Sequence, residues 1–436
     1  MKHLIFAAAL AASTVAFADP VVSNVTLTAA VNGVATITYK LGDGPAVITL
    51  DIEKKTGDVW QSIGEERLWR LSGDVNRKVS GTSGTIAWSV DGAIDAASYR
   101  AKVTAWPMDD TPDYMVVSLA KAQNAEDRIR YYTSTNALPG GLLANTAYRT
   151  TMMVFKKVMA KGVAWKMGCT KDEPTYNVYQ ARETQHDVTL DRNYYLAVFP
   201  ATQAQCTLMR GSVIDENHTI ERRMRIQSKL NYANYVRNTN WPAAPHSGTL
   251  LGQARALTDQ LVDFDLPTEA EWEFACRAGH GPGYWGDGSK MTMVTYTQIN
   301  ECKNLAKIGR YRYNQKTNAG DNAYNKNLDS EDCTPIAGSY KPNDWGFYDM
   351  NGGVEEFCLD WYQEDITKLK GAINVSKDDG SKCADGTAGE SKVLRGGSWA
   401  SAAYQVRPAM RGYVSTSYYG DKHSLGFRPR AYMGLK

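Results

Sequence analysis

The chain has 436 residues, and 49 Lys and Arg stand against 47 Asp and Glu, so its formal net charge is only +2. This balance argues against a strongly basic nucleic-acid-binding protein, and a hydrophobic content of 43% excludes disorder over most of the chain. The length predicts two or three domains. The 25 Tyr and 11 Trp outnumber the 9 Phe, which suits a recognition surface and equally an extracellular β protein that uses these rings structurally.

Residues 1–18 predict a signal peptide. Lys2 precedes an apolar run, and the segment ends in the small-x-small sequence Ala16-Phe17-Ala18. We expect cleavage after Ala18 and export to the periplasm, the cell surface or the medium. No other stretch approaches the roughly 18 apolar residues of a membrane-spanning helix, so no membrane span is expected.

Export would allow disulfides to form. The odd number of cysteines leaves at least one of them free or intermolecular, and their spacing does not define the connectivity. Cys302 and Cys333 bracket a polar stretch, and we predict a disulfide between them. The seven cysteines are Cys169, Cys206, Cys276, Cys302, Cys333, Cys358 and Cys383.

Residues 19–107 predict a β-sandwich. Short β-branched runs alternate with Gly and Asp turns. Val34, Thr36 and Thr38 follow a two-residue period, as expected for a strand with one buried face. The segment resembles an immunoglobulin-like or fibronectin type III-like module, which implies a spacer or a binding module. The five runs are VSNVTLTAA, VATITYKL, AVITLDIEK, GTIAWSVD and SYRAKVTAW.

Residues 108–149 lose this alternation and contain Pro139-Gly140-Gly141. They predict a connector with one short helix. We place the start of the last domain, residues 150–436, at Thr150.

The last domain carries four sequence motifs in a fixed order. They are LPTEAEWEFACRAG (266–279), GSYKPNDWGFYDMNGGVEEFCLDWY (338–362), VLRGGSW (393–399) and LGFRPR (425–430). In this order they resemble the formylglycine-generating enzyme family, also called sulfatase-modifying factors. The resemblance implies an α+β, C-type-lectin-like fold with much irregular structure.

Two helix starts follow from local sequence. Thr268 and Glu271 form a predicted capping box, and Gly279 stands where a left-handed C-terminal cap is expected. Thr202 and Gln205 repeat the start signal. The carboxylates Glu269, Glu271 and Glu273 are therefore interpreted as structural rather than catalytic.

The oxidases of this family hold copper(I) with two cysteines five residues apart, just after the RGGS motif, because copper(I) prefers soft thiolate ligands. The alignment places Ser401 and Val406 at those positions. No cysteine follows Cys383, so no copper is expected, and the oxidase activity of the family is in doubt. The related ergothioneine-synthesis enzymes bind iron through an H-x3-H-x-E-like set, which the dispersed histidines here do not reproduce.

The resemblance also implies a calcium ion held by the segment 349–356. Its ligands would be side-chain oxygens of Asp349 and Glu356 and the main-chain carbonyls of Gly352 and Val354, a hard-oxygen set that calcium favours. The alternative is an acidic turn without a metal. A second family site would involve Asn304 and Leu305.

The stretch between RGGSW and GFR, residues 400–425, is similar to the region that presents variable side chains in the lectin-like variable proteins of diversity-generating retroelements. Its mixture of aromatic and small polar residues is typical of an antibody paratope. The alternative is that its tyrosines pack the C-terminal strands. The candidate ligand-binding residues are Ser401, Tyr404, Tyr413, Ser415, Thr416, Ser417, Tyr418, Tyr419, Asp421 and His423.

These observations together favour an exported protein that binds a protein, peptide or glycan ligand at the 400–425 surface, with no nucleic-acid partner. Two alternatives stay open. One is a sulfatase-maturation-related or other oxidoreductase of the same family with a different metal site. The other is a structural component of the cell surface.

Overall fold

The computed structural model describes residues 19–432 except for residues 69, 93, 121–123, 172, 174–181, 215–223, 240–242, 293–301, 315–333, 365, 367–390 and 419–423. The chain divides into two compact units, Met1–Asp110 and Thr111–Lys436. The predicted signal peptide, residues 1–18, lies outside the described residues. None of the described helices has the length and apolar character needed to cross a membrane.

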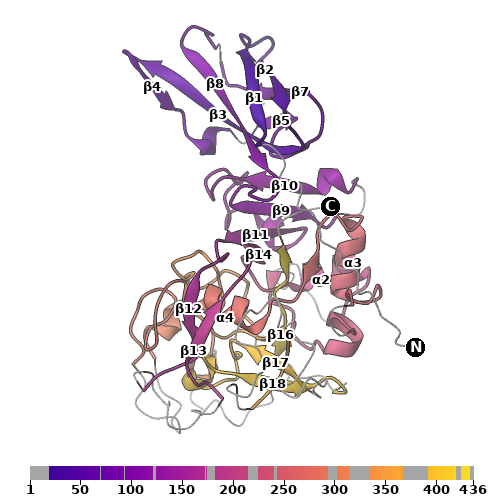
Figure 1. The fold of residues 1–436 in the computed structure, drawn as a ribbon, viewed down its shortest axis with the longest axis vertical. Helices are drawn as coiled ribbons and strands as arrows, with labels where there is room; N and C mark the ends of the chain where they lie inside the picture. The colour runs from indigo at the N-terminus through magenta and orange to yellow at the C-terminus, as the bar shows by residue number, and fades with distance from the viewer. Residues whose placement is uncertain are drawn as a thin grey trace, which may run out of the picture. The chain divides into compact units, whose positions relative to one another are not determined.

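The first unit contains two antiparallel sheets (Figure 1). One has the order β1-β2-β7-β5, formed by β1 (Val21–Leu27), β2 (Val34–Gly42), β7 (Ser83–Ser89) and β5 (Leu71–Gly73). In the other, β3 (Ala46–Thr56) pairs with β4 (Val59–Ser62), β6 (Arg77–Val79) and β8 (Tyr99–Pro107). A 3-10 helix, η1 (Glu65–Arg67), follows β4.

One hydrophobic core joins the two sheets of the first unit. In β2 the buried side chains are those of Ala35, Ile37, Tyr39 and Leu41, which alternate with less buried neighbours. The period of two was predicted, but the face was wrong, because the core takes the odd-numbered residues instead of Val34, Thr36 and Thr38. Assignment of this unit to the immunoglobulin or fibronectin class stays a prediction.

The second unit is built around a six-stranded antiparallel sheet with the order β10-β9-β11-β14-β20-β15. Figure 1 shows β10, β9, β11 and β14 lying side by side in that order. The strands are β9 (Tyr114–Ser118), β10 (Ile129–Tyr132), β11 (Met152–Val158), β14 (Tyr194–Ala197), β15 (Phe264–Asp265) and β20 (Arg430–Tyr432).

The expected connector, residues 108–149, is therefore largely part of the second unit. β9 pairs with both β10 and β11, and all five of its residues are buried. A strand that is covered on both faces does not alternate between apolar and polar residues. The pattern used to find strands was for this reason absent from β9. The only helices described in this segment are two short 3-10 turns, η2 (Glu126–Arg128) and η3 (Thr146–Arg149).

A second, four-stranded sheet has the order β18-β17-β16-β19. It comprises β16 (Glu355–Trp361), β17 (Ser391–Arg395), β18 (Gly412–Ser415) and β19 (Leu425–Gly426), and only the β16–β19 pair is parallel. A separate hairpin-like pair joins β12 (Ala164–Met167) and β13 (His186–Thr189). The second unit is thus rich in strands and poor in helix, as the family resemblance implies.

The helices of the second unit are short. Besides η2 and η3, the described residues form α2 (Gln203–Arg210), α3 (Leu250–Leu257), α4 (Glu269–Arg277) and α5 (Leu305–Ile308), the 3-10 turns η6 (Arg312–Asn314) and η8 (Ala403–Val406), and a π-helical turn, η5 (Tyr232–Val236). Both predicted capping boxes are present: Thr202 with Gln205 begins α2, and Thr268 with Glu271 begins α4. The left-handed C-terminal cap of α4 is Ala278, one residue before the predicted Gly279.

Candidate functional site

A pocket of about 190 Å³ opens beside the segment that follows the RGGSW motif. Cavities of about 150 Å³ accept a guest the size of benzene, so this pocket has room for a single side chain or a small molecule. Its walls come from β16, β17, β18 and the turn at residues 397–405. The lining residues are Arg182, Glu355, Leu394, Gly397, Ser401, Gln405, Met410, Arg411, Gly412 and Tyr413.

Two of the candidate ligand-binding residues, Ser401 and Tyr413, line this pocket. The Ser401 hydroxyl accepts a hydrogen bond from the backbone N–H of Ser398 at 3.0 Å. Tyr404 lies in η8 outside the pocket lining. The hydroxyl of Ser415, the last residue of β18, shares a hydrogen bond at 2.8 Å with the hydroxyl of Ser417 in the turn that follows.

The other candidates divide into two groups. Thr416 and Tyr418 are half-buried in the turn after β18, and the Tyr418 N–H donates to the Ser415 carbonyl. Tyr419, Asp421 and His423 lie outside the described residues.

Tyr413 forms the exposed rim of the pocket. Its side chain is 51% exposed, and its ring stacks on Tyr362 with the centroids 4.4 Å apart and the planes 27° apart. The guanidinium of Arg411 lies 5.1 Å from the centre of the Tyr362 ring on which Tyr413 rests. An exposed ring supported from behind in this way can contact a ligand with little loss of conformational entropy.

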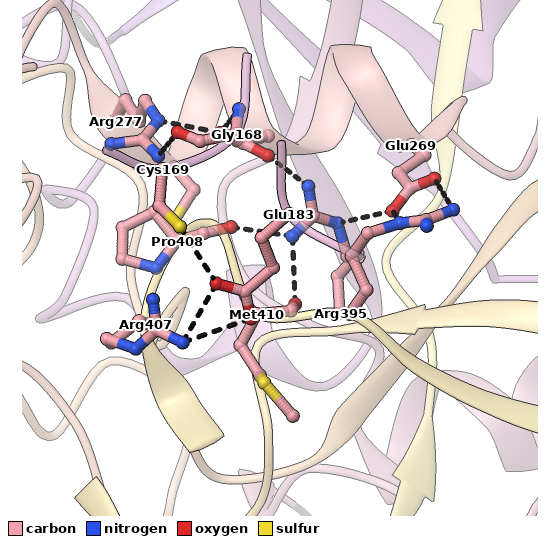
Figure 2. A network of polar contacts seen from close by, with 12 residues as sticks. Gly168, Cys169, Glu183, Glu269, Arg277, Arg395, Arg407, Pro408 and Met410 are labelled. Carbon is pink, nitrogen blue, oxygen red and sulfur yellow. Dashed lines mark hydrogen bonds and ion pairs between the residues drawn. The ribbon is translucent and has the colours of Figure 1, made fainter. Parts of the chain in front are cut away.

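Three buried arginines hold the pocket wall in place. Arg395 donates to the carbonyls of Pro408 and Met410 at 2.7 and 2.8 Å, and Figure 2 shows these contacts with the surrounding carboxylates. Arg407 donates to the Tyr404 carbonyl at 2.9 Å, and its guanidinium also pairs with Glu173 and Glu183.

Arg411 fixes the other side of the same wall. It donates to both oxygens of Glu269 at 2.6 and 2.9 Å and to the carbonyls of Gln363 and Arg182. Arg395 shares Glu269 with Arg411 and also pairs with Glu273, which pairs in turn with Arg277. The backbone from 404 to 411 is thus tied to α4 and to distant loops through side chains that solvent does not reach.

Burial and neighbouring positive charges have opposite effects on the pKa values of the carboxylates in this network. Burial acts to raise the pKa of Glu273, but the guanidinium groups of Arg277 and Arg395 and the Gly168 N–H outweigh it and lower the pKa to about 2. Burial raises the pKa of Glu183 despite its pairing with Arg407. Figure 2 shows the Cys169 thiol pointing at Glu183, to which it donates at 3.3 Å.

The sequence did not reveal this network. The helix carboxylates Glu269, Glu271 and Glu273 were assigned a structural role, and they do lie buried beside arginines. The signal that pointed toward the network was present in α4, where acidic residues fall on two opposite faces of a helix that is buried along its whole length. Such carboxylates need buried cationic partners.

The described cysteines lie outside the pocket. Cys169, Cys206, Cys276, Cys302 and Cys358 are all buried, and none belongs to the pocket lining. Burial raises the pKa of the Cys276 thiol to about 12 and that of Cys358 well above its ordinary value. Ser401 offers a hydroxyl at the position expected for a thiol, while Val406 is completely buried. Cys333 lies outside the described residues, so the Cys302–Cys333 disulfide stays a prediction.

The expected calcium ligands have other partners. Both oxygens of Glu356 accept hydrogen bonds from Arg428, at 3.0 and 3.1 Å, and one also accepts from the Trp272 indole at 2.7 Å. A dication on this carboxylate would lie beside a guanidinium and be repelled by it. The Gly352 carbonyl accepts from the Val354 N–H.

Asp349 has one oxygen bonded to the Gly338 N–H at 2.7 Å and one without a hydrogen-bond partner. Burial raises its pKa to about 6. The set of four ligands therefore does not fit calcium well, and the structure does not test the calcium that the resemblance implies. At the second expected site the Asn304 side chain bonds the Lys290 carbonyl, and the Leu305 carbonyl accepts from the Gly309 N–H. Across the described residues, no three His, Cys, Asp or Glu side chains gather in a way that would hold a metal ion.

The chain is similar to one domain family and to several known proteins. The profile of the sulfatase-modifying factor enzyme 1-like domain matches residues 144–429. A serine/threonine-protein kinase pkn1 of Chlamydia caviae is 33% identical over 159 residues, which are 35% of this chain and 20% of the kinase. A formylglycine-generating enzyme of Streptomyces coelicolor is 31% identical over 166 residues, which are 37% of this chain and 45% of the enzyme.

Among solved structures, PvdO from Pseudomonas aeruginosa is 19% identical and covers 64% of this chain and 94% of its own, with a TM-score of 0.44. Treponema denticola variable protein 1 is 20% identical and covers 65% of this chain and 96% of its own, also with a TM-score of 0.44. The chain spans less than half the length of the two curated relatives named above. Because the profile match covers most of the chain and includes three of the four sequence motifs in full and all but the last residue of the fourth, the protein belongs to the sulfatase-modifying factor enzyme 1-like domain family.

Proposed function

We propose that this protein is an exported ligand-binding protein, in which the sulfatase-modifying-factor-like domain captures a protein, peptide or glycan through the 400–425 surface. The pocket beside Ser401 is the observation that carries the proposal. It is lined by two of the candidate ligand-binding residues and has an exposed aromatic rim at Tyr413. Concave sites with a few polar groups and an aromatic wall are the usual form of small-ligand sites.

The chemistry of the lining supports binding over oxidation. Its ten described residues include a serine, a glutamine, a carboxylate, two guanidinium groups and a tyrosine, but no cysteine. Copper(I) needs soft sulfur ligands, and the described thiols are buried elsewhere with raised pKa values at Cys169, Cys206, Cys276 and Cys358. The pocket therefore offers hydrogen bonds and charge, without a thiolate that would activate oxygen.

The enzyme alternative is supported by the relatives named formylglycine-generating enzyme. It is tested by incubating the purified chain with copper and a Cys-containing sulfatase peptide, followed by mass spectrometry. We expect the peptide mass to stay unchanged. Conversion of the peptide cysteine to formylglycine that depends on this protein would overturn the binding-only proposal.

The binding proposal itself is tested with peptide and glycan arrays. Tyr413→Ala should remove capture, because the exposed ring is at the mouth of the pocket. Tyr284 offers a matched control in the same unit, since it is 44% exposed and outside the lining, and Tyr284→Ala should bind like the unaltered protein. If no array member is captured, or if both variants behave alike, the pocket is not the ligand site, and a structural role at the cell surface becomes the better proposal.

A further inference from the structure

We propose that the pocket binds a single pyranose ring of a glycan, which stacks on the Tyr413 ring and bonds the polar side chains of the lining through its hydroxyl groups. This inference rests on the proposed ligand-binding function and names the chemical class of its ligand. Three features of the pocket carry it: its size, the hydrogen-bond donors that the described residues leave without an acceptor, and the aromatic and apolar surfaces beside these donors.

The pocket has the size of one sugar ring. Its volume is about 190 Å³, and a cavity of about 150 Å³ holds benzene, which is also a six-membered ring. The additional volume accommodates hydroxyl groups attached to such a ring. The pocket therefore takes one pyranose, and the rest of a glycan would extend over the exposed rim at Tyr413.

Two lining side chains hold hydrogen-bond donors that no described residue accepts. The Oε1 atom of Gln405 accepts from the Ala402 N–H at 2.9 Å, which fixes the amide and leaves its Nε2 group for a ligand. Arg182 donates to Glu364 through Nε and Nη2, at 3.2 and 2.8 Å, which leaves its Nη1 group. Arg411 holds the backbone of Arg182 by donating to its carbonyl at 3.2 Å. Both donors are thus positioned before a ligand binds.

The lining also provides two hydroxyl groups, which can both donate and accept hydrogen bonds. The Ser401 hydroxyl accepts from the Ser398 N–H at 3.0 Å and has its own proton to donate, and Tyr413 carries the second hydroxyl at the rim. Both guanidinium groups of the lining have carboxylate partners, so they do not require an anionic ligand. The hydroxyl groups of a sugar donate and accept as well, and they therefore match this mixed set without adding a charge.

The remaining walls suit the apolar faces of a sugar ring. One face of the Tyr413 ring stacks on Tyr362, and the other is available at the rim because the residue is 51% exposed. The face of an aromatic ring carries partial negative charge, which attracts the weakly positive C–H groups of a pyranose. Leu394 and Met410 add apolar surface to the lining. A ring with C–H groups on its faces and hydroxyls around its edge is thus complementary to this pocket.

The test uses the full mature chain, with binding measured by calorimetry and by ligand-observed NMR. The sugar probes are the methyl glycosides of glucose, galactose, mannose and N-acetylglucosamine. Methoxycyclohexane provides the same ring size without the other hydroxyl groups, and the Nα-acetyl amides of lysine and glutamate represent charged peptide side chains. At least one glycoside should bind about tenfold or more tightly than each of these three controls, because every additional hydrogen bond contributes a factor of about two to ten.

Substitutions separate the ring contact from the hydrogen bonds. Tyr413→Ala should weaken glycoside binding about tenfold, as truncation of an anchoring tyrosine does, and Tyr413→Phe should weaken it less because the aromatic face stays. Gln405→Glu retains an oxygen that accepts from Ala402 but removes the amide donor, so it should weaken binding about two- to tenfold. Gln253 lies outside the lining, and Gln253→Glu should leave binding unchanged. Melting temperatures show that every variant is folded.

The outcomes distinguish the two levels of the proposal. The sugar is the wrong ligand if no glycoside binds more tightly than methoxycyclohexane, if a charged amino-acid probe binds more tightly than every glycoside, or if Tyr413→Ala and Gln405→Glu both leave glycoside binding unchanged. Capture of a peptide from an array would then keep the binding function in place. If none of the probes binds and an array of mixed peptides and glycans is not captured either, both the ligand class and the proposed function are wrong.

Discussion

Replacing Glu273 with Gln removes one negative charge from the centre of the network that supports the pocket wall. The side chain is fully buried. One of its oxygens accepts from Arg277 at 2.7 Å and from the Gly168 N–H at 2.9 Å, and the other pairs with Arg395. The amide has nearly the same shape as the carboxylate, so the variant changes charge and hydrogen bonding while leaving the packing nearly intact.

The cost follows from the pKa of the carboxylate. Its fall from 4.5 to about 2 corresponds to about 3 kcal/mol, at about 1.4 kcal/mol for each pKa unit. Removal of one partner from a buried ion pair typically costs about 3–5 kcal/mol, because the remaining charge has lost its compensation. We therefore expect Glu273→Gln to lower the unfolding free energy of the second unit by about 3 kcal/mol at neutral pH.

The same shift gives the pH dependence. The folded-state pKa is depressed, so the contribution of the carboxylate is complete above about 4.5 and is lost as the pH falls through about 2. The unaltered protein should lose this stability over that range, while the Gln variant has no such carboxylate to protonate. The difference in stability between the two proteins should therefore shrink as the pH is lowered.

Scanning calorimetry at several pH values measures both effects. A loss of about 3 kcal/mol would lower the melting temperature of a unit of this size by roughly 4 °C. Glu364→Gln is the control, since Glu364 pairs with Arg182 but is 66% exposed, and exposed pairs contribute about 0–1 kcal/mol. A cost below about 1 kcal/mol for Glu273→Gln would refute the assignment of Glu273 as the buried counter-ion of Arg277 and Arg395.

Three further predictions concern the capping box at the start of α4, the tyrosine at the rim of the pocket and the expected calcium ion. Thr268→Ala should cost about 1 kcal/mol of unfolding free energy, measured by urea titration, because its hydroxyl accepts the Glu271 N–H at the start of α4; a neutral result would show that the cap is dispensable. Tyr413→Ala should leave the melting temperature nearly unchanged, while Val414→Ala, at a position only 5% exposed, should lower it. Added calcium should not raise the melting temperature, because Arg428 already neutralises Glu356; a rise that a chelator reverses and Asp349→Ala abolishes would restore the calcium site.

The elements that the sequence predicted are those whose signals are local. The strands of the first unit follow from a period of two, and the capping boxes at Thr202 and Thr268 need only residues three positions apart. The buried face of β2 was misassigned although the pattern contained the signal, because Ile37 and Leu41 on the buried face are more apolar than Thr36, Thr38 and Lys40 on the other. β9 lacked the alternation because it is covered on both sides.

The buried ion pairs that support the pocket wall could not be predicted from such local signals. The contacts of Arg407 with Glu173 and Glu183 join residues separated by more than 200 positions, and Arg411 meets Glu269 across 142. No periodicity relates such partners. The family alignment placed Ser401 at the expected thiol position, but it gave no indication that Glu355 and Tyr413 lie in the same pocket.

Fixing the backbone and lining the pocket, two roles that a single loop usually combines, are carried here by different residues. The backbone between Tyr404 and Arg411 is fixed by Arg395, Arg407 and Arg411, whose guanidinium groups face the interior and bond carbonyls and buried carboxylates. The side chains of Ser401 and Tyr413 contribute to the lining without joining this network. Substitutions at those two positions therefore change what the pocket presents at small cost in stability, whereas substitutions of the arginines leave buried charges unpaired. A domain built in this way can change the side chains at Ser401 and Tyr413 while retaining its fold.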